Sequence, residues 1–290
     1  MLCKACPRQC NAERNETVNK GGFCEMPLYP VVARAALHFG EEPCISGKNG
    51  SGTIFFSGCS LKCVYCQNEI ISHKNKGKII SPKRLAEIFK ELENSGAHNI
   101  NFVNPTHFIY AIKEALSIYK PRIPLVYNSS GYDLPEKIGE DIFDIYLMDL
   151  KYINEEKSLR YSGVNNYFEY ASKSIKEAYR LKGETVFDDN GLMKSGVIVR
   201  HLILPMNTNE SKKIVDWFND NTNNAVLSLM SQYTPMAKAE EFSEINRKIT
   251  KREYDKVIDY AIMKNIKKVY VQEMSSADKS YIPNFDLYGV

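Results

Sequence analysis

The sequence has little tryptophan and histidine, and it lacks any long apolar run. Its 290 residues include one tryptophan and five histidines. No stretch approaches the roughly 18 consecutive apolar residues that a membrane-spanning helix needs, so we expect no membrane span. The first residues, MLCKAC, lack the apolar core of a signal peptide, which makes a cytoplasmic location the default expectation.

The sequence also lacks an excess of charge of either sign. It contains 38 Lys and Arg against 35 Asp and Glu, for a net charge of +3, and no block of like charge. Nucleic-acid binders usually concentrate positive charge on one face, so the composition does not favour a nucleic-acid partner. Hydrophobic residues at 43% and charged residues at 25% are typical of a globular protein with one barrel-type domain or two ordinary domains.

Cysteine is the residue whose distribution stands out. Seven of the eight cysteines fall into two tight groups, which are Cys3, Cys6, Cys10 and Cys24, and then Cys59, Cys63 and Cys66. In a chain without an export signal, clustered cysteines bind metal more often than they form disulfides. Cys44 has no nearby partner in the sequence and is expected to be a packing residue.

Strand-like and helix-like segments alternate after about residue 50. The expected strands cover residues 53–57, 99–103, 124–127, 143–150, 197–204, 225–230 and 268–272, and the expected helices follow Ser81-Pro82, span 108–119 and 166–181, and follow Thr250. This alternation predicts an α/β fold with parallel strands, either a partial (β/α)6-type TIM barrel or a doubly wound open sheet. We expect residues 51–290 to form this unit, preceded by a cysteine-rich N-terminal segment at 1–50.

The second cysteine group directly follows the first expected strand of this unit. Cys59, Cys63 and Cys66 form a CxxxCxxC motif in the loop where a barrel places its active site. Three thiolates can hold three irons of a [4Fe–4S] cluster and leave the fourth iron open to a ligand. The alternatives are three buried structural cysteines or a zinc site.

This spacing, with Tyr65 before the third cysteine, resembles the signature of the radical S-adenosylmethionine (SAM) superfamily. The resemblance implies a cluster that binds SAM and cleaves it reductively to a 5′-deoxyadenosyl radical, which abstracts hydrogen from a substrate. A narrower resemblance is to the PflX-type proteins, which are similar to pyruvate formate-lyase activating enzyme. It rests on the segments 6–8, 42–47, 52–59, 66–68, 104–108, 128–132, 149–152, 199–202 and 231–233.

The resemblance implies that SAM is bound at successive strand ends. The implied residues are Tyr65, Asn104, Thr106, Asn128, Ser130, Asp149, Lys151 and Arg200. Many relatives carry a Gly-Gly-Glu motif where this chain has Asn104-Pro105-Thr106, so backbone carbonyls or these side chains would have to replace the glutamate. Asp149-Leu150-Lys151 matches the Asp-Leu-Lys motif of glycyl-radical activases, whose lysine approaches the SAM carboxylate. Arg200 could pair with the same carboxylate.

Each of these residues also has an ordinary structural interpretation. Asp149 and Lys151 could form an edge ion pair, Arg200 could be structural, and residues 128–132 have the composition of a turn. His201 is more often a satisfied buried histidine than a catalyst. Side chains that could face the site are His107, His201, Gln232, Tyr233, Gln272 and Glu273. No catalytic residue is assigned.

The N-terminal cysteines also allow two metal interpretations. Cys3, Cys6, Cys10 and Cys24 give four thiolates within a short segment, and the first pair has zinc-ligand spacing. A structural zinc is slightly favoured over an auxiliary iron–sulfur cluster. Reduced thiols without a ligand are the remaining alternative.

Two classes of function remain. The first is a radical SAM enzyme that receives electrons from a donor such as flavodoxin or ferredoxin, and abstracts hydrogen from a glycyl radical enzyme or from a small molecule. The second is a non-catalytic iron–sulfur or zinc protein that transfers electrons or binds a partner. The activase version follows from resemblance alone, because a shared fold does not fix a function.

Overall fold

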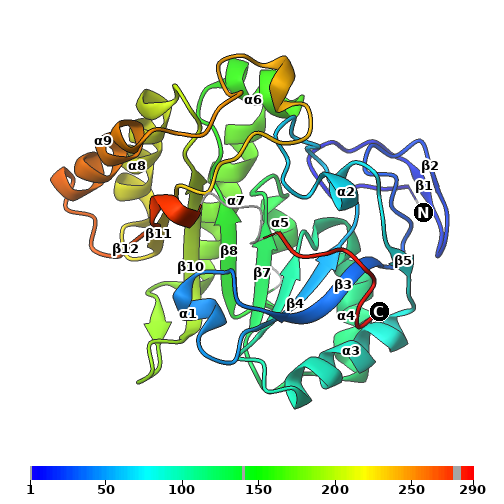
Figure 1. The fold of residues 1–290 in the computed structure, drawn as a ribbon. Helices are drawn as coiled ribbons and strands as arrows, with labels where there is room; N and C mark the ends of the chain where they lie inside the picture. The colour runs from blue at the N-terminus through cyan, green and yellow to red at the C-terminus, as the bar shows by residue number, and fades with distance from the viewer. Residues whose placement is uncertain (1, 139–140, 277–281) are drawn as a thin grey trace.

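A computed structural model describes residues 2–138, 141–276 and 282–290. Its centre is a curved sheet in which neighbouring strands run parallel (Figure 1). The parallel strands are β4 (Ser51–Phe56), β6 (Ile100–Val103), β7 (Leu125–Ser129), β8 (Ile145–Asp149), β10 (Met193–Leu202), β11 (Val226–Met230) and β12 (Val269–Val271). All seven strands expected from the sequence are therefore present.

The order of the strands decides between the two expected layouts. The parallel strands lie in the sheet in the order in which they follow along the chain, from β4 to β12. A doubly wound sheet reverses its direction of winding near the middle, whereas a barrel keeps one direction. The described strands thus form a mixed α/β fold with a largely parallel sheet of the partial-barrel kind.

Helices cover the outer face of this sheet (Figure 1). They are α3 (Pro82–Asn94), α4 (Ile109–Ile118), α7 (Tyr167–Lys182), α8 (Thr208–Thr222) and α9 (Lys251–Met263). Helix α3 begins as the sequence predicts, because the Ser81 hydroxyl accepts a hydrogen bond from the Arg84 amide and Pro82 occupies the first helical turn. Helix α9 begins with a capping box between Thr250 and Glu253.

The inner face of the sheet is apolar at one end and polar at the other. Val126, Leu147 and Ile198 pack against Cys44 and Ile45 of the short helix α1 (Pro43–Ser46). Further along the same strands, this face carries Asn128, Asp149, Arg200 and Ser228. Since side chains alternate across a strand, the polar set lies on the same side as the apolar set, nearer the carboxyl ends of the strands.

The segment 1–50 is not separate from the barrel along its whole length. Strand β3 (Val31–His38) pairs antiparallel with β4 and with β5 (Lys78–Ile79), so it belongs to the main sheet. The part before it contains a small hairpin of β1 (Glu13–Arg14) and β2 (Asn19–Lys20), which forms its own two-stranded sheet, while Cys24 and Met26 pack in the main core. Residues 31–38 of the expected N-terminal segment therefore lie in the main sheet. The remaining short elements are α2 (Glu69–Ser72), α5 (Pro135–Ile138), α6 (Glu155–Ser162), β9 (Val186–Phe187), η1 (Thr106–Phe108), η2 (Ala239–Glu241) and η3 (Met274–Ser276).

No helix in the described ranges is both long enough and apolar enough to span a bilayer.

Candidate active site

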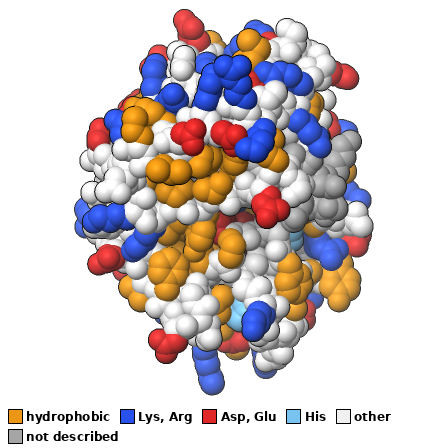
Figure 2. Space-filling view, turned by 60° about the vertical axis from the view of Figure 1, so that its left-hand side comes forward, with side chains coloured by type: hydrophobic (Ala, Val, Ile, Leu, Met, Phe, Trp, Pro, Cys, Tyr) orange, Lys and Arg blue, Asp and Glu red, His pale blue; other side chains and the backbone are white. Residues whose placement is uncertain are grey.

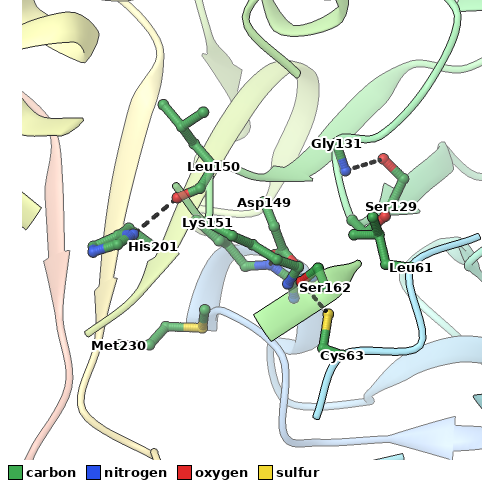
Figure 3. Close-up of polar contacts among 12 residues, drawn as sticks. Leu61, Cys63, Ser129, Gly131, Asp149, Leu150, Lys151, Ser162, His201 and Met230 are labelled. Atoms are coloured by element: carbon green, nitrogen blue, oxygen red, sulfur yellow. Dashed lines mark hydrogen bonds and ion pairs between the residues drawn. The ribbon is translucent and has the colours of Figure 1, made fainter. Parts of the chain in front are cut away.

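The loop after β4 brings three cysteines to one cavity. Cys59, Cys63 and Cys66 all line a cavity of about 160 Å³ at the carboxyl ends of the strands. The Cys63 sulfur lies 3.0 Å from the hydroxyl of Ser162, as Figure 3 shows, and the Cys66 sulfur accepts a hydrogen bond of 3.1 Å from Ser72. None of the three is in a disulfide. The three cysteines that form one motif in the sequence therefore line one cavity in the fold.

Burial makes these thiols poor acids in the absence of a positive ligand. It raises the pKa of Cys63 to about 11 and that of Cys66 to about 12, and the neighbouring thiols raise the Cys66 value further. Lys151 acts in the opposite direction on Cys63. A metal that binds thiolate must therefore displace protons here, and its own charge favours that displacement.

Asp149, Lys151 and Arg200 form one ion-pair network at the ends of β8 and β10. The Asp149 carboxylate lies 2.6 Å from Lys151 Nζ and 2.9 Å from Arg200 Nε. Burial alone would raise the pKa of Asp149, but the two cations outweigh it and hold that pKa below its usual value. The contact between Asp149 and Lys151 is the one that the ion-pair interpretation of the sequence described, and Figure 3 shows both residues near Cys63.

The structure adds two carboxylates that the sequence analysis did not place in the site. Glu41 and Glu42 precede α1 and enter the inner face of the sheet. Glu41 accepts hydrogen bonds from Asn101 (3.2 Å) and Asn128 (3.1 Å), and it lies 3.1 Å from Arg200 Nη1. The sequence feature that could have pointed to them is that Glu42 begins segment 42–47, which carries part of the PflX-type resemblance.

A second, larger cavity adjoins the cysteine cavity. It has a volume of about 230 Å³, and its lining includes Glu41, Glu42, Gln232 and Gln272 together with Cys63 and Cys66. Six residues besides these two cysteines line both cavities, namely Asn68, Val103, Asn128, Asp149, Lys151 and Arg200. Hydrophobic side chains gather around a hollow at the centre of the face in Figure 2, and Lys and Arg gather above it. The two cavities are thus neighbouring parts of one site.

The other residues implied for SAM binding differ in position. Asn104 and Ser130 line the cysteine cavity, and the Asn104 amide donates a hydrogen bond to the Gly58 carbonyl. Tyr65 lines the larger cavity, although its hydroxyl is hydrogen-bonded to that of Tyr152. Thr106 lines neither cavity, because its buried hydroxyl donates to Asp133 at 2.6 Å.

The two histidines considered for the site are buried in the framework. His201 donates from Nδ1 to the Leu150 carbonyl at 2.8 Å (Figure 3), and its Nε2 lies 2.8 Å from the Ser211 hydroxyl. His107 donates from Nε2 to the Ser57 carbonyl at 2.9 Å. Burial lowers the pKa of each to about 4, so both rings are neutral at physiological pH. The structural interpretation of His201 therefore fits the structure better.

Of the four other side chains considered for the site, two line a cavity and two do not. Gln232 and Gln272 line the larger cavity. Tyr233 is buried with its hydroxyl on the Ile245 carbonyl, and Glu273 is exposed outside the lining of either cavity.

The N-terminal cysteines lie close enough to influence one another. Burial raises the pKa of Cys6 to about 12, and Cys24, Cys3 and Cys10 add to the shift. Within the described residues, no three Cys, His, Asp or Glu side chains are arranged to hold a single metal ion. Zinc and an auxiliary cluster at these cysteines therefore both stay predictions.

An arginine joins this N-terminal segment to the loop that carries the second cysteine group. Arg8 donates to the Ser60 carbonyl in that loop and to the Ser162 carbonyl at 3.4 Å. Ser162 also contacts Cys63, so the two cysteine groups share a neighbour.

Comparisons with known proteins complete the description of the site. An uncharacterized protein of Methanocaldococcus jannaschii is 34% identical over 280 residues, which is 92% of this chain and 76% of that protein. Among solved structures, the crystal structure of Streptococcus suis SuiB bound to S-adenosylmethionine matches with a TM-score of 0.48 and 15% identity over 78% of this chain. The match covers 48% of the SuiB chain, so this chain spans about half of its length. The model of the radical SAM superfamily matches residues 53–218, which contain the three cysteines, Asp149, Lys151 and Arg200. The chain therefore belongs to the radical SAM superfamily, whose enzymes cleave S-adenosylmethionine with a [4Fe–4S] cluster.

Proposed function

We propose that this radical SAM enzyme abstracts a hydrogen atom from a small molecule bound in the larger cavity. The observation that carries the proposal is that this cavity reaches from Cys63 and Cys66 to a polar lining that includes Glu41, Glu42 and Gln272. A concave site of about 230 Å³ with a few convergent polar groups suits a small substrate. Activation of a glycyl radical enzyme would instead need room for a protein loop.

We assign the cluster to Cys59, Cys63 and Cys66. The donor set fits, because three free thiols line one cavity and iron–sulfur clusters prefer thiolate ligands. Ser162 and Ser72 supply hydrogen bonds to two of the sulfurs, which orients them and stabilises their thiolate forms. When bound, the reduced cluster supplies the electron that converts SAM to methionine and a 5′-deoxyadenosyl radical.

The network beside the cysteines supplies groups that suit SAM. Lys151 and Arg200 are cations suited to a carboxylate, and Asn128 and Ser130 offer polar groups for a carboxylate or ribose. Asp149 holds both cations through its two oxygens, so they are already oriented before a ligand enters. Such preorganisation lowers the entropic cost of binding.

We propose further that Cys3, Cys6, Cys10 and Cys24 hold a metal or a second cluster, and that an external carrier such as flavodoxin or ferredoxin supplies electrons. Four thiols within one short segment are ligands that zinc and iron–sulfur clusters both prefer, and the Arg8 contacts join this segment to the second cysteine loop.

The test of the reaction is anaerobic reconstitution with iron and sulfide, followed by dithionite and SAM. We expect 5′-deoxyadenosine from the wild-type protein and none from Cys63→Ala. Cys44→Ala is the matched control, because Cys44 is also buried but packs against the apolar end of the inner face and lines neither cavity. A protein with a full cluster that formed no 5′-deoxyadenosine would contradict the proposal.

The test of the substrate class uses an extract of cells grown in heavy water, separated into small-molecule and protein fractions. The 5′-deoxyadenosine formed in each incubation carries deuterium when its radical has taken it from a component of that fraction. We expect deuterium with the small-molecule fraction. Deuterium with the protein fraction alone would favour a protein substrate instead.

A further inference from the structure

The carboxylate of Glu42 is buried without a full set of partners. The residue is 7% exposed and lines the larger cavity, and within the described residues its Oε2 atom has no hydrogen-bond partner. Glu42 immediately precedes α1, yet its side chain does not cap that helix. A buried carboxylate oxygen without a partner is costly, and ligand sites are where such costs occur.

The charges around Glu42 do not balance. Among the residues that the structure describes, the network contains the carboxylates of Glu41, Glu42 and Asp149 but only the cations Lys151 and Arg200. Lys151 is paired with Asp149, and Arg200 directs its three nitrogens to Asp149, Glu41 and Asn128. No ion pair to Glu42 is present in the described part of the chain. One more cation would complete the set.

Glu42 does not line the smaller cavity, which all three cysteines share. All three cysteines line the smaller cavity, together with Lys151 and Arg200, whereas Glu41 and Glu42 line only the larger one. The missing cation would therefore enter from the larger cavity, which Lys151 and Arg200 also line.

We propose that Glu42, with Glu41 beside it, binds an ammonium or guanidinium group of the small-molecule substrate. This inference rests on the proposed function and narrows its substrate class. The Glu42 oxygen without a partner accepts the N–H of the ligand, and the added positive charge balances the third carboxylate. An organic cation suits the site better than a metal ion, because the Arg200 guanidinium already lies beside Glu41 and would repel a small, dense charge.

The titration of Glu42 is consistent with a missing cation. Burial raises its pKa, Arg200 lowers it, and Glu41 raises it again. The Ser228 hydroxyl beside it lowers the pKa as well. In the ligand-free site the charged form of Glu42 is therefore less stable than it is in water. A bound cation would stabilise that charged form and lower the pKa.

The test uses the reconstituted holoenzyme with SAM bound and no reductant. Calorimetric titration with n-propylguanidinium, with neutral butyramide and with Mg²⁺ provides the probes. We expect n-propylguanidinium to bind the wild type and to bind Glu42→Gln at least about tenfold more weakly, because a charge-assisted hydrogen bond is lost. Glu240→Gln, an exposed position outside both cavities, should bind as the wild type does.

Four outcomes would overturn the inference. They are equal binding of butyramide, equal binding by Glu42→Gln, binding of Mg²⁺ in place of the organic cation, and a loss of SAM affinity as the main effect of Glu42→Gln. Cleavage of SAM by the same preparation is measured in parallel. If SAM is cleaved and the probe does not bind, this inference alone fails, whereas a loaded enzyme that does not cleave SAM refutes the proposed function whatever the probe does.

Discussion

The guanidinium of Arg200 on β10 lies 2.9 Å from the carboxylate of Asp149 on β8, and these two residues are direct partners in the strand register. The strand register therefore brings the two side chains next to each other. Because Arg200 also reaches Glu41 and Asn128, a single side chain connects β8, β7 and the segment before α1. The network therefore joins these elements, and its residues Asn128, Asp149, Lys151 and Arg200 line both cavities.

We expect Asp149→Asn to destabilise the apo protein by about 3 kcal/mol, because it leaves the largely buried cations Lys151 and Arg200 without their shared partner. Urea unfolding measures this change. The exposed pair Glu169–Lys173 provides the control, since Glu169→Gln should change the free energy of unfolding by less than about 0.5 kcal/mol. Equal effects of the two variants would show that the Asp149 network adds nothing to stability.

The stabilising effect of Asp149 should depend on pH in a defined direction. Its folded pKa is held below the usual value near 3.8, so its contribution is complete above about pH 4 and is lost as the pH falls through the folded pKa. The difference in unfolding free energy between the wild type and Asp149→Asn should therefore shrink below pH 4. A difference that stayed constant down to pH 2 would contradict the ion-pair explanation.

Glu42 should show the opposite dependence. Its pKa is raised in the fold, so the native state holds its proton more tightly than the unfolded chain does. Stability of the apo protein should then fall as the pH rises from about 4.3 through the folded pKa. Compared with Glu42→Gln, the wild type should lose stability with increasing pH, as measured by urea unfolding of both proteins from pH 4 to 8. Parallel profiles would mean that Glu42 ionises as freely in the fold as in the unfolded chain.

The sequence predicted the sheet well because its strands are short apolar runs with clear ends. Residues 225–230, for example, were expected as a strand and form β11 almost completely. Helix α8 was not expected, since Asn, Asp and Thr are frequent in it and have low helical propensity. Packing of Ile214, Val215 and Phe218 in the core stabilises it instead, and the helical spacing of these three residues is the local signal that was overlooked.

The candidate site was predictable only where its residues lie at strand ends. Asp149, Lys151 and Arg200 were found because parallel strands bring their carboxyl ends together. Glu41 and Glu42 were missed because β3 runs antiparallel to β4, which returns the chain to the inner face of the sheet. Their position depends on tertiary pairing over the full length of β3, and that pairing was not read from the sequence.

The N-terminal cysteines predict a second metal in addition to the cluster. We expect anaerobically purified protein to contain either about eight irons, for two clusters, or about four irons and one zinc. Cys6→Ser should remove the second metal and leave the cluster at Cys59, Cys63 and Cys66 in place. Metal and sulfide analysis measures this, with Cys44→Ser as the control. About four irons and no zinc in both the wild type and Cys6→Ser would contradict a second site.

His201 and His107 should make the protein sensitive to mild acid. Each has an ordinary value near 6.5 and a folded pKa of about 4, because burial disfavours the charged ring. Between these values the unfolded chain binds more protons than the native state, so the unfolding free energy falls as the pH decreases, by up to about 1.4 kcal/mol per pH unit for each histidine. The unfolding free energy is measured with urea from pH 4.5 to 6.5. We expect its change per pH unit to be smaller in His201→Gln than in the wild type by about the contribution of one histidine, and the same for His107→Gln. Since both rings stay neutral above pH 5, SAM cleavage by the wild type should show no inflection from them between pH 5 and 8. An unchanged slope in His201→Gln would mean that this ring takes up its proton within the folded protein.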